Sequence, residues 1–298
     1  MTDEKGIKTI GKVVSLPLWE GKQRDFSTLL ERIISEGKRL LDTETKSADA
    51  VECSVAAMTF KGKPIGVPVG VIKDFSQDDI EAWTHLSQLL SEKFAGIPCF
   101  IENDGNAAAL SISRKTGLRN IIILRFGTNS CIGYIDKFGK IPLGPNEFSK
   151  LRLDLTDDHP DPYYQGRTSS YLSFRGICHI AEKLSVLTSE QPENNSVPEQ
   201  IRDMLGSSLA TERSSAEKVY KELGRYATSF ILEMAMRFAV QNVIFVGSII
   251  SGEPKDLIMS SANHYLRSTL HRPGIRLLAS SAEIDRLSGA GFAFYSTC

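Results

Sequence analysis

The chain of 298 residues is nearly neutral, with 35 Lys and Arg residues against 36 Asp and Glu residues, and a formal net charge of −1 at pH 7. This balance argues against the basic surface typical of nucleic-acid or charged-membrane binding, and the sequence contains no long apolar run and no secretion signal. With 41% hydrophobic residues, we expect a globular cytoplasmic protein long enough for two domains.

In chain order, the first predicted elements form a βαβ pattern. A strand over residues 10–18 is followed by a helix whose apolar stripe begins at Phe26, and then by a strand over residues 48–60. This pattern favours parallel strand pairing through a right-handed crossover. We expect a second helix to begin after Ser76, because Ser76 and Asp79 have a spacing close to that of a capping box.

The remaining predicted elements continue the mixture of strands and helices. A short buried strand over residues 98–101 leads into a closely packed helix that starts near Asn106. The others are a strand at 120–126, a returning strand at 132–135, loops at 154–165 and 188–198, and a long amphipathic helix at 214–241.

The five cysteines are scattered and form no Cys-x-x-Cys pair. This pattern favours reduced thiols in small apolar sites over a disulfide framework or a cysteine zinc cluster. They are Cys53, Cys99, Cys131, Cys178 and Cys298.

The most informative segment places Asp104 between two amides, Asn103 and Asn106, where the strand at 98–101 gives way to a helix. Open α/β sheets bind their ligands at the carboxyl ends of their strands. A carboxylate held there can accept a proton from a substrate hydroxyl. Asn and Asp also favour helix caps and turns, so a capping turn explains the same residues about equally well.

A second segment follows about twenty residues later. The strand at 120–126 ends in Gly127, Thr128, Asn129 and Ser130, after which strand character returns. A Gly-Thr turn with free backbone N–H groups can cradle a phosphate. On these residues alone, an ordinary tight hairpin remains the alternative.

In this order and spacing, the two segments resemble the ROK family of bacterial sugar kinases and related repressors, within the actin-like sugar kinase superfamily. The family writes the first segment as Glu-Asn-Asp-Ala-Asn-Ala-Ala, which this sequence matches at all but Gly105. It writes the second as Gly-Thr-Gly followed by a glycine run. Segments 144–148, 242–248 and 288–293 resemble further family segments, in the family's order.

The resemblance implies an α/β fold, the two-lobed actin-like (ribonuclease H-like) ATPase fold, with a truncated N-terminal lobe. We expect residues 1–115 to form the incomplete N-terminal lobe and residues 116–285 the C-terminal lobe. Residues 286–298 would form a C-terminal helix that can return to the first lobe.

The resemblance also implies ATP-dependent phosphorylation of a hexose or amino sugar. Asp104 would be the catalytic base, and the sugar-binding residues would be Asn103, Glu147 and Ser169, the last near the position of a second sugar-contacting Glu in the family. Gly127, Thr128 and Asn129 would hold phosphate, and Gly247 and Ser248 would lie against the adenosine. ATP and Mg²⁺ are the implied cofactors, a sugar or sugar derivative the implied ligand, and a homodimer the implied assembly.

The sequence departs from the family at its N-terminus. Family kinases begin with a strand, an Asp-x-Gly-Gly-Thr turn that binds the ATP phosphates with magnesium, and a second strand, and this chain has no such turn. Three hypotheses remain open. The strand at 10–18 pairs with the strand at 48–60, a neighbouring chain supplies the edge, or Met1 is an internal methionine of a longer gene product.

Two other departures concern zinc and phosphate. Lys150 stands where the family has a zinc-binding His, and residues 166–171 replace its cysteine cluster, so we expect no structural zinc. Asn129, Ser130, Cys131 and Ile132 stand where the family prefers Gly, Ile, Gly and Gly. Side chains in place of glycines hinder close approach to a phosphate. Because losing one set of charge-stabilising donors can cost roughly 10²–10³ in rate, we expect impaired catalysis.

A non-catalytic ROK relative that binds a sugar or serves a regulatory role is the alternative hypothesis. The ROK repressors carry a winged helix-turn-helix ahead of the kinase-like body, and the sequence leaves no room for one before Ile10. We therefore expect no nucleic-acid partner, and no membrane partner.

Overall fold

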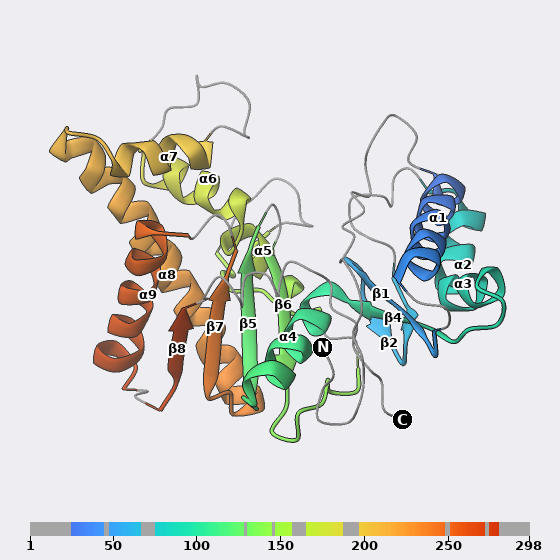
Figure 1. The fold of residues 1–298 in the computed structure, drawn as a ribbon. Coiled ribbons are helices and arrows are strands. Elements are labelled where there is room, and N and C mark those ends of the chain that lie inside the picture. Colours follow the sequence, from blue (N-terminus) through green and yellow to red (C-terminus); the bar gives the residue numbers. More distant parts are fainter. Residues whose placement is uncertain are drawn as a thin grey trace.

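The computed structural model describes residues 25–44, 48–66, 75–127, 130–144, 147–156, 165–186, 197–247, 251–271 and 274–279. Within them, helices and strands form two groups that are joined by one helix, α4 (Asp104–Thr116) (Figure 1). The predicted strand at 10–18 and the predicted C-terminal helix at 286–298 lie outside the described residues.

The first group is a small sheet with helices on one face. Its central pair is β1 (Val51–Val55) and β4 (Cys99–Asn103), which run parallel with Val51 opposite Cys99. A short hairpin, β2 (Thr59–Phe60) and β3 (Lys63–Pro64), lies beside β4. Helices α1 (Phe26–Glu44), α2 (Gln77–Thr84) and α3 (Leu86–Lys93) bury their apolar stripes against the pair, around Trp83 and Leu86.

Two predicted elements of this group differ from the structure. The strand expected over residues 48–60 is interrupted, because the chain turns between β1 and β2, where the Ala57 carbonyl accepts a hydrogen bond from the Asn103 side chain. The helix that follows Ser76 breaks at His85 into α2 and α3. The predicted capping box is confirmed, since Ser76 Oγ accepts from the Asp79 N–H at 3.1 Å and Asp79 Oδ2 accepts from the Ser76 N–H at 2.9 Å.

The second group is built on a four-stranded sheet in the order β6-β5-β7-β8. The hairpin predicted around Gly127 is confirmed: β5 (Ile121–Phe126) and β6 (Ser130–Ile135) are antiparallel. The other two strands, β7 (Asn242–Val246) and β8 (Arg276–Ala279), run parallel to β5.

Helices cover both faces of this sheet. One face packs against α4, and the other packs against a larger set of helices. That set contains η1 (Phe148–Lys150), α5 (Thr168–Tyr171), α6 (Phe174–Lys183), α7 (Val197–Leu205), α8 (Ala210–Phe238), α9 (Glu253–His264) and a π-helical turn, η3 (Tyr265–Thr269). The predicted long helix is therefore confirmed as α8. It begins four residues earlier than expected and ends at Phe238, because the backbone of the next residue, Ala239, is left-handed.

Alternation along β5 sorts its side chains between the two cores. Ile122 and Leu124 pack into the larger core with α8, while Ile121 and Ile123 pack against α4. Since successive side chains of a strand point to opposite faces, Arg125 belongs to the face that α4 covers. This placement directs a cation toward the start of α4.

Helix α4 contacts both groups of elements. It follows directly from β4, and its alanine-rich face packs on β5 and β6. Close packing of this kind needs small side chains, which Ala107 and Ala109 supply. The domain limit predicted at residue 115 stays a prediction. No helix in the described parts of the chain is both long and apolar enough to cross a membrane.

Candidate functional site

The start of α4 is fixed by Asn103. Its side-chain oxygen accepts the backbone N–H groups of Gly105 at 2.9 Å and Asn106 at 3.2 Å, which makes it the helix N-cap. Its side-chain nitrogen donates to the Ala57 carbonyl at 3.1 Å. The capping role that the sequence left open therefore falls on Asn103. The second amide hydrogen of Asn103 has no acceptor among the described residues. The predicted role of Asn103 in sugar binding stays a prediction.

A network behind this cap involves two residues that the sequence reasoning did not single out. Glu102 Oε1 accepts from Thr59 Oγ1 at 2.5 Å, from the Asn103 N–H at 2.8 Å and from Asn106 Nδ2 at 3.1 Å. The Glu102 carboxylate thus links Thr59 of β2 to Asn103 and Asn106 at the start of α4. Glu102 could have been singled out because the family's motif begins with Glu. Thr59 lies 43 residues away, and no motif in the sequence marks it.

Asp104 occupies the first position of α4 and is not used as its cap. Among the described backbone donors, its Oδ1 accepts only the adjacent Gly105 N–H, at 3.0 Å, and the Cys131 thiol donates to the carboxylate. Partial burial, helped by the charge of Glu147, raises the pKa of Asp104 to about 6, although Cys131, Arg125 and the Gly105 N–H act in the opposite direction. A carboxylate with such a pKa is ionised at pH 7 and is a stronger base than an ordinary Asp.

Gly105, the one departure from the family's first motif, is explained by contact with β6. A Cβ at Gly105 would lie 2.4 Å from the Ile132 carbonyl oxygen, and a Cβ at Gly133 would lie 1.9 Å from the Gly105 carbonyl oxygen. Two glycines therefore allow the backbones of α4 and β6 to touch. This close approach holds Asp104 against the hairpin of β5 and β6.

Cys131 and Arg125 are further site residues that the sequence reasoning did not assign. They are cross-strand partners on β6 and β5, and both interact electrostatically with Asp104. Burial, followed by the charge of Asp104, raises the pKa of the Cys131 thiol well above its usual range, so the thiol is protonated and acts as a donor. A Gly at position 131 would leave the Asp104 carboxylate without this partner.

The predicted sugar-binding Glu147 lies close to Asp104. It precedes η1 and accepts a short hydrogen bond from Ser149, and its charge acts on both Asp104 and Cys131. The predicted Ser169 lies on α5, which packs against η1. Its carbonyl accepts from Ser173 Oγ at 2.6 Å. Their sugar-binding roles stay predictions.

Two predicted nucleotide-binding glycines end neighbouring strands. Gly127 follows β5, and its carbonyl accepts the Phe174 N–H at 2.8 Å. Gly247 follows β7 with φ +122°, and a Cβ there would lie 2.2 Å from the Phe126 carbonyl oxygen. Glycine at position 247 is thus already required by the packing of β7 on β5. The other predicted residues of this set, Thr128, Asn129 and Ser248, lie outside the described residues.

No cluster of His, Cys, Asp or Glu suited to a metal ion occurs within the described ranges. Lys150, at the position of the family's zinc-binding His, ends η1. The described cysteines are free thiols, as the sequence predicted. Cys298 lies outside the described residues.

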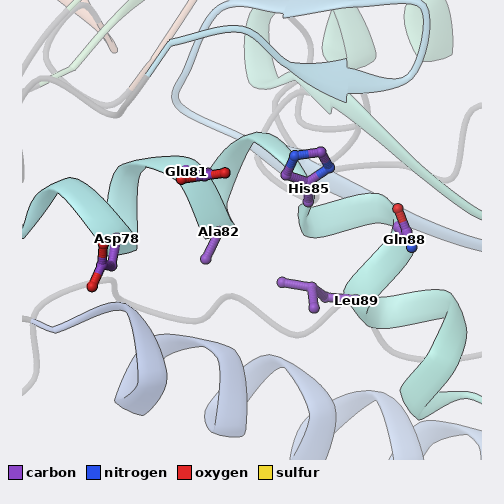
Figure 2. A pocket seen from close by; sticks show the side chains of 6 residues that line it. All are labelled: Asp78, Glu81, Ala82, His85, Gln88 and Leu89. Carbon is purple, nitrogen blue, oxygen red and sulfur yellow. The ribbon is translucent and has the colours of Figure 1, made fainter.

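An open hollow of about 510 Å³ lies on the first group of elements, and Asp104 is not among its lining residues. Figure 2 shows its lining side chains, which come from α2, from α3 and from His85 between them. The polar part of the lining consists of Asp78, Glu81, His85 and Gln88. None of the predicted site residues contributes to this hollow, so the candidate site remains the junction of α4 with β5 and β6.

Comparison with known protein families shows to which family the chain belongs. The model of the ROK family matches residues 40–293. The chain belongs to the ROK family. The suspected membership is therefore confirmed, and the match covers β1, β4, α4 and the four-stranded sheet.

Solved structures with the same fold include both enzymes and a regulator. The ROK hexokinase from Thermus thermophilus is 16% identical, with a TM-score of 0.65, over 90% of this chain and 86% of the hexokinase chain. The ROK family glucokinase from Streptomyces griseus, solved with glucose and AMPPNP, is 21% identical, with a TM-score of 0.56, over 87% and 86% of the two chains. A ROK family transcriptional regulator, a homolog of the E. coli MLC protein, is 15% identical, with a TM-score of 0.66, over 90% and 68%.

These likenesses confirm the predicted fold class, an α/β actin-like fold of the ROK sugar kinase type. At such low identities they show the fold and leave the ligand to be argued from the site. The search of curated protein sequences finds no significant match.

Proposed function

We propose that this protein is a sugar kinase-like ROK member that binds a hexose or amino sugar beside Asp104 and phosphorylates it slowly with ATP. The proposal rests on one observation, that Asn103 and Asp104 have different roles at the start of α4. Asn103 caps the helix, so the Asp104 carboxylate is left for a ligand. With its pKa raised to about 6, it suits the acceptance of a proton from a sugar hydroxyl at neutral pH.

Glu147 supports the same assignment. Its carboxylate acts on Asp104 electrostatically, and two adjacent carboxylates offer several acceptors to the vicinal hydroxyls of a sugar. Ser149, which donates to Glu147, holds that side chain in place. We infer that Asp104 removes the proton while Glu147 orients the sugar.

ATP and Mg²⁺ are the cofactors of the proposed reaction. The carboxyl ends of β5 and β7, marked by Gly127 and Gly247, are where open α/β sheets bind ligands. The oxygens of Asp104 and Glu147 are of the type that Mg²⁺ prefers. When bound, Mg²⁺ would neutralise charge on the transferred phosphoryl group.

We expect a reduced rate because of Cys131. Its thiol donates to the carboxylate that must accept the sugar proton, so a substrate hydroxyl has to displace it. Phosphoryl transfer depends almost entirely on positioning and electrostatic stabilisation. Substitution of the family's glycines by Asn129, Cys131 and Ile132 acts in the same direction.

The test is a coupled assay of ADP formation over a panel of hexoses and amino sugars. We expect sugar-stimulated turnover for the unmodified protein and a loss of at least about 10²-fold in Asp104→Asn. Asp203→Asn, on the exposed face of α7, is the matched control and should retain full activity. Sugar-stimulated turnover that persists in Asp104→Asn would overturn the assignment of the base.

A non-catalytic sugar-binding ROK relative is the second candidate function, and the contact between Cys131 and Asp104 favours it. In that case calorimetry would detect sugar binding while no sugar stimulates ADP formation. Cys131→Gly removes the thiol and restores the residue the family prefers there. Turnover that appears in this variant would identify the protein as a kinase with an obstructed base, whereas its continued absence would support the binding function.

A further inference from the structure

Arg125 is a cation that the strand pattern places beside Asp104. It follows Ile123 on the face of β5 that packs against α4. Its cross-strand partner is Cys131, whose thiol donates to Asp104. The guanidinium interacts electrostatically with Asp104 and with Cys131. The strand register and the electrostatic interactions thus both place the Arg125 guanidinium beside Asp104.

The guanidinium has no hydrogen-bond or ion-pair partner among the residues that the structure describes, although its side chain is half-buried. Other arginines pair, for example Arg213 with Glu253 and Arg237 with Glu233. Partly buried donors in folded proteins generally find acceptors, and a guanidinium carries five N–H groups. Within the described part of the chain, the donors of Arg125 are therefore available to a ligand.

The chemistry of the surroundings specifies that ligand. The fork of a guanidinium matches a phosphate group with two parallel hydrogen bonds. The N-terminus of α4 adds a partial positive charge on the same side of the sheet. Asp104 and Glu147 repel a bare anion, so the best ligand offers hydroxyls to the carboxylates and a phosphate to Arg125.

We propose that Arg125 binds a phosphate group of the ligand beside Asp104. The inference deepens the proposed function and rests on it, because the hydroxyls in this arrangement are those of the sugar. The phosphate has one of two sources: the phosphoryl group that a nucleotide transfers, or a phosphate that the sugar already carries. Both present the same oxygens to Arg125.

The experiment is calorimetric titration of the full chain with orthophosphate, ATP, glucose 6-phosphate and glucose. The variants are Arg125→Met, which keeps an unbranched side chain without charge, and Arg125→Lys, which keeps the charge without the fork. Arg237→Met is the matched control, because it removes a surface arginine on α8 far along the chain. Thermal unfolding of each variant verifies that it is folded.

We expect Arg125→Met to weaken the binding of phosphate-bearing probes at least tenfold while the affinity for glucose changes less than twofold. Arg125→Lys should lie between, and Arg237→Met should match the unmodified protein. A loss confined to ATP identifies the nucleotide as the source, and a loss for glucose 6-phosphate identifies the sugar.

The inference is overturned if Arg125→Met binds all phosphate-bearing probes as well as the unmodified protein does, if Arg237→Met weakens them equally, or if the unmodified protein binds none of them. The outcome for the proposed function is separate. Orthophosphate binding that depends on Arg125, in a protein that binds neither glucose nor any other sugar of the panel, would retain the phosphate subsite and overturn the sugar kinase proposal.

Discussion

The start of α4 and the start of β6 touch each other, yet they relate to the family pattern in opposite ways. At the start of α4 the sequence matches the family motif at every position but Gly105, and each side chain around the cap is hydrogen-bonded. At the start of β6, Cys131 and Ile132 stand where the family prefers glycine. One region keeps the family's motif, and the other alters the residues beside it.

The contact between the two regions explains Gly105. The missing methyl group of Gly105 faces the Ile132 carbonyl, with only 2.4 Å left for a Cβ. The departure in the first motif thus lies directly against a departure in the second.

The largest expected effect comes from restoring the family's residue at this contact. In an ordinary helix, Gly→Ala stabilises by about 1 kcal/mol. At Gly105 the new methyl group meets backbone, which cannot rotate away, and overpacking typically costs 1–3 kcal/mol. We therefore expect Gly105→Ala to lower the free energy of unfolding by about 2 kcal/mol in urea titrations.

Lys115→Ala, on the exposed end of α4, is the control and should stay within about 0.5 kcal/mol of the unmodified protein. If Gly105→Ala is as stable as the unmodified protein, the backbone contact is not as close as the structure has it.

The next effect separates Asn103 from its neighbour Asp104. Asn103→Ala removes the cap of α4 and the bond to Ala57, and we expect a loss of about 1–2 kcal/mol in unfolding free energy. Asp104→Asn leaves these bonds intact. Because burial disfavours the charged form of Asp104, we expect this variant to unfold at a temperature no lower than the unmodified protein at pH 7. The reverse ranking would mean that Asp104 is the structural residue and Asn103 is not.

A smaller effect contrasts two carboxylates on neighbouring strands. Glu102 accepts from three donors, whereas the buried Oε2 of Glu52 on β1 has no hydrogen-bond partner in the part of the chain that the structure describes. Burial raises the pKa of Glu52 to about 8, against an opposing effect of Arg114. Since the folded-state pKa exceeds the unfolded one, the stability due to Glu52 is complete below pH 4.5 and is lost as the pH rises through 8.

Urea unfolding from pH 5 to 9 tests whether the free energy of unfolding falls as the pH rises. Glu52→Gln should reduce the decline in unfolding free energy, by about 1 kcal/mol at pH 8 after allowance for solvent screening. In contrast, the contribution of Asp104 to the decline should be complete near pH 6. An identical pH dependence in Glu52→Gln and the unmodified protein would show that Glu52 is already solvated in the folded state.

Local patterns were enough to predict much of this structure. The capping box at Ser76, the strand and helix around Asp104 and the hairpin at Gly127 each depend on residues within a few positions of one another. The break after β1 was missed. The Ala57 carbonyl in this break accepts from Asn103, which is 46 residues away, and local patterns do not reveal such a contact. The group around Asp104 was predicted only in part, because Arg125 and Cys131 join it through strand register, which sequence spacing does not reveal.

The most direct test of the central claim is the affinity for the best-binding sugar of the panel, measured by calorimetry from pH 5 to 8. The account predicts that affinity falls as the pH drops through about 6, because a protonated Asp104 accepts hydrogen bonds poorly, and that Asp104→Asn binds weakly at every pH. Sugar affinity that stays constant through pH 6 and is equal in Asp104→Asn would contradict the account.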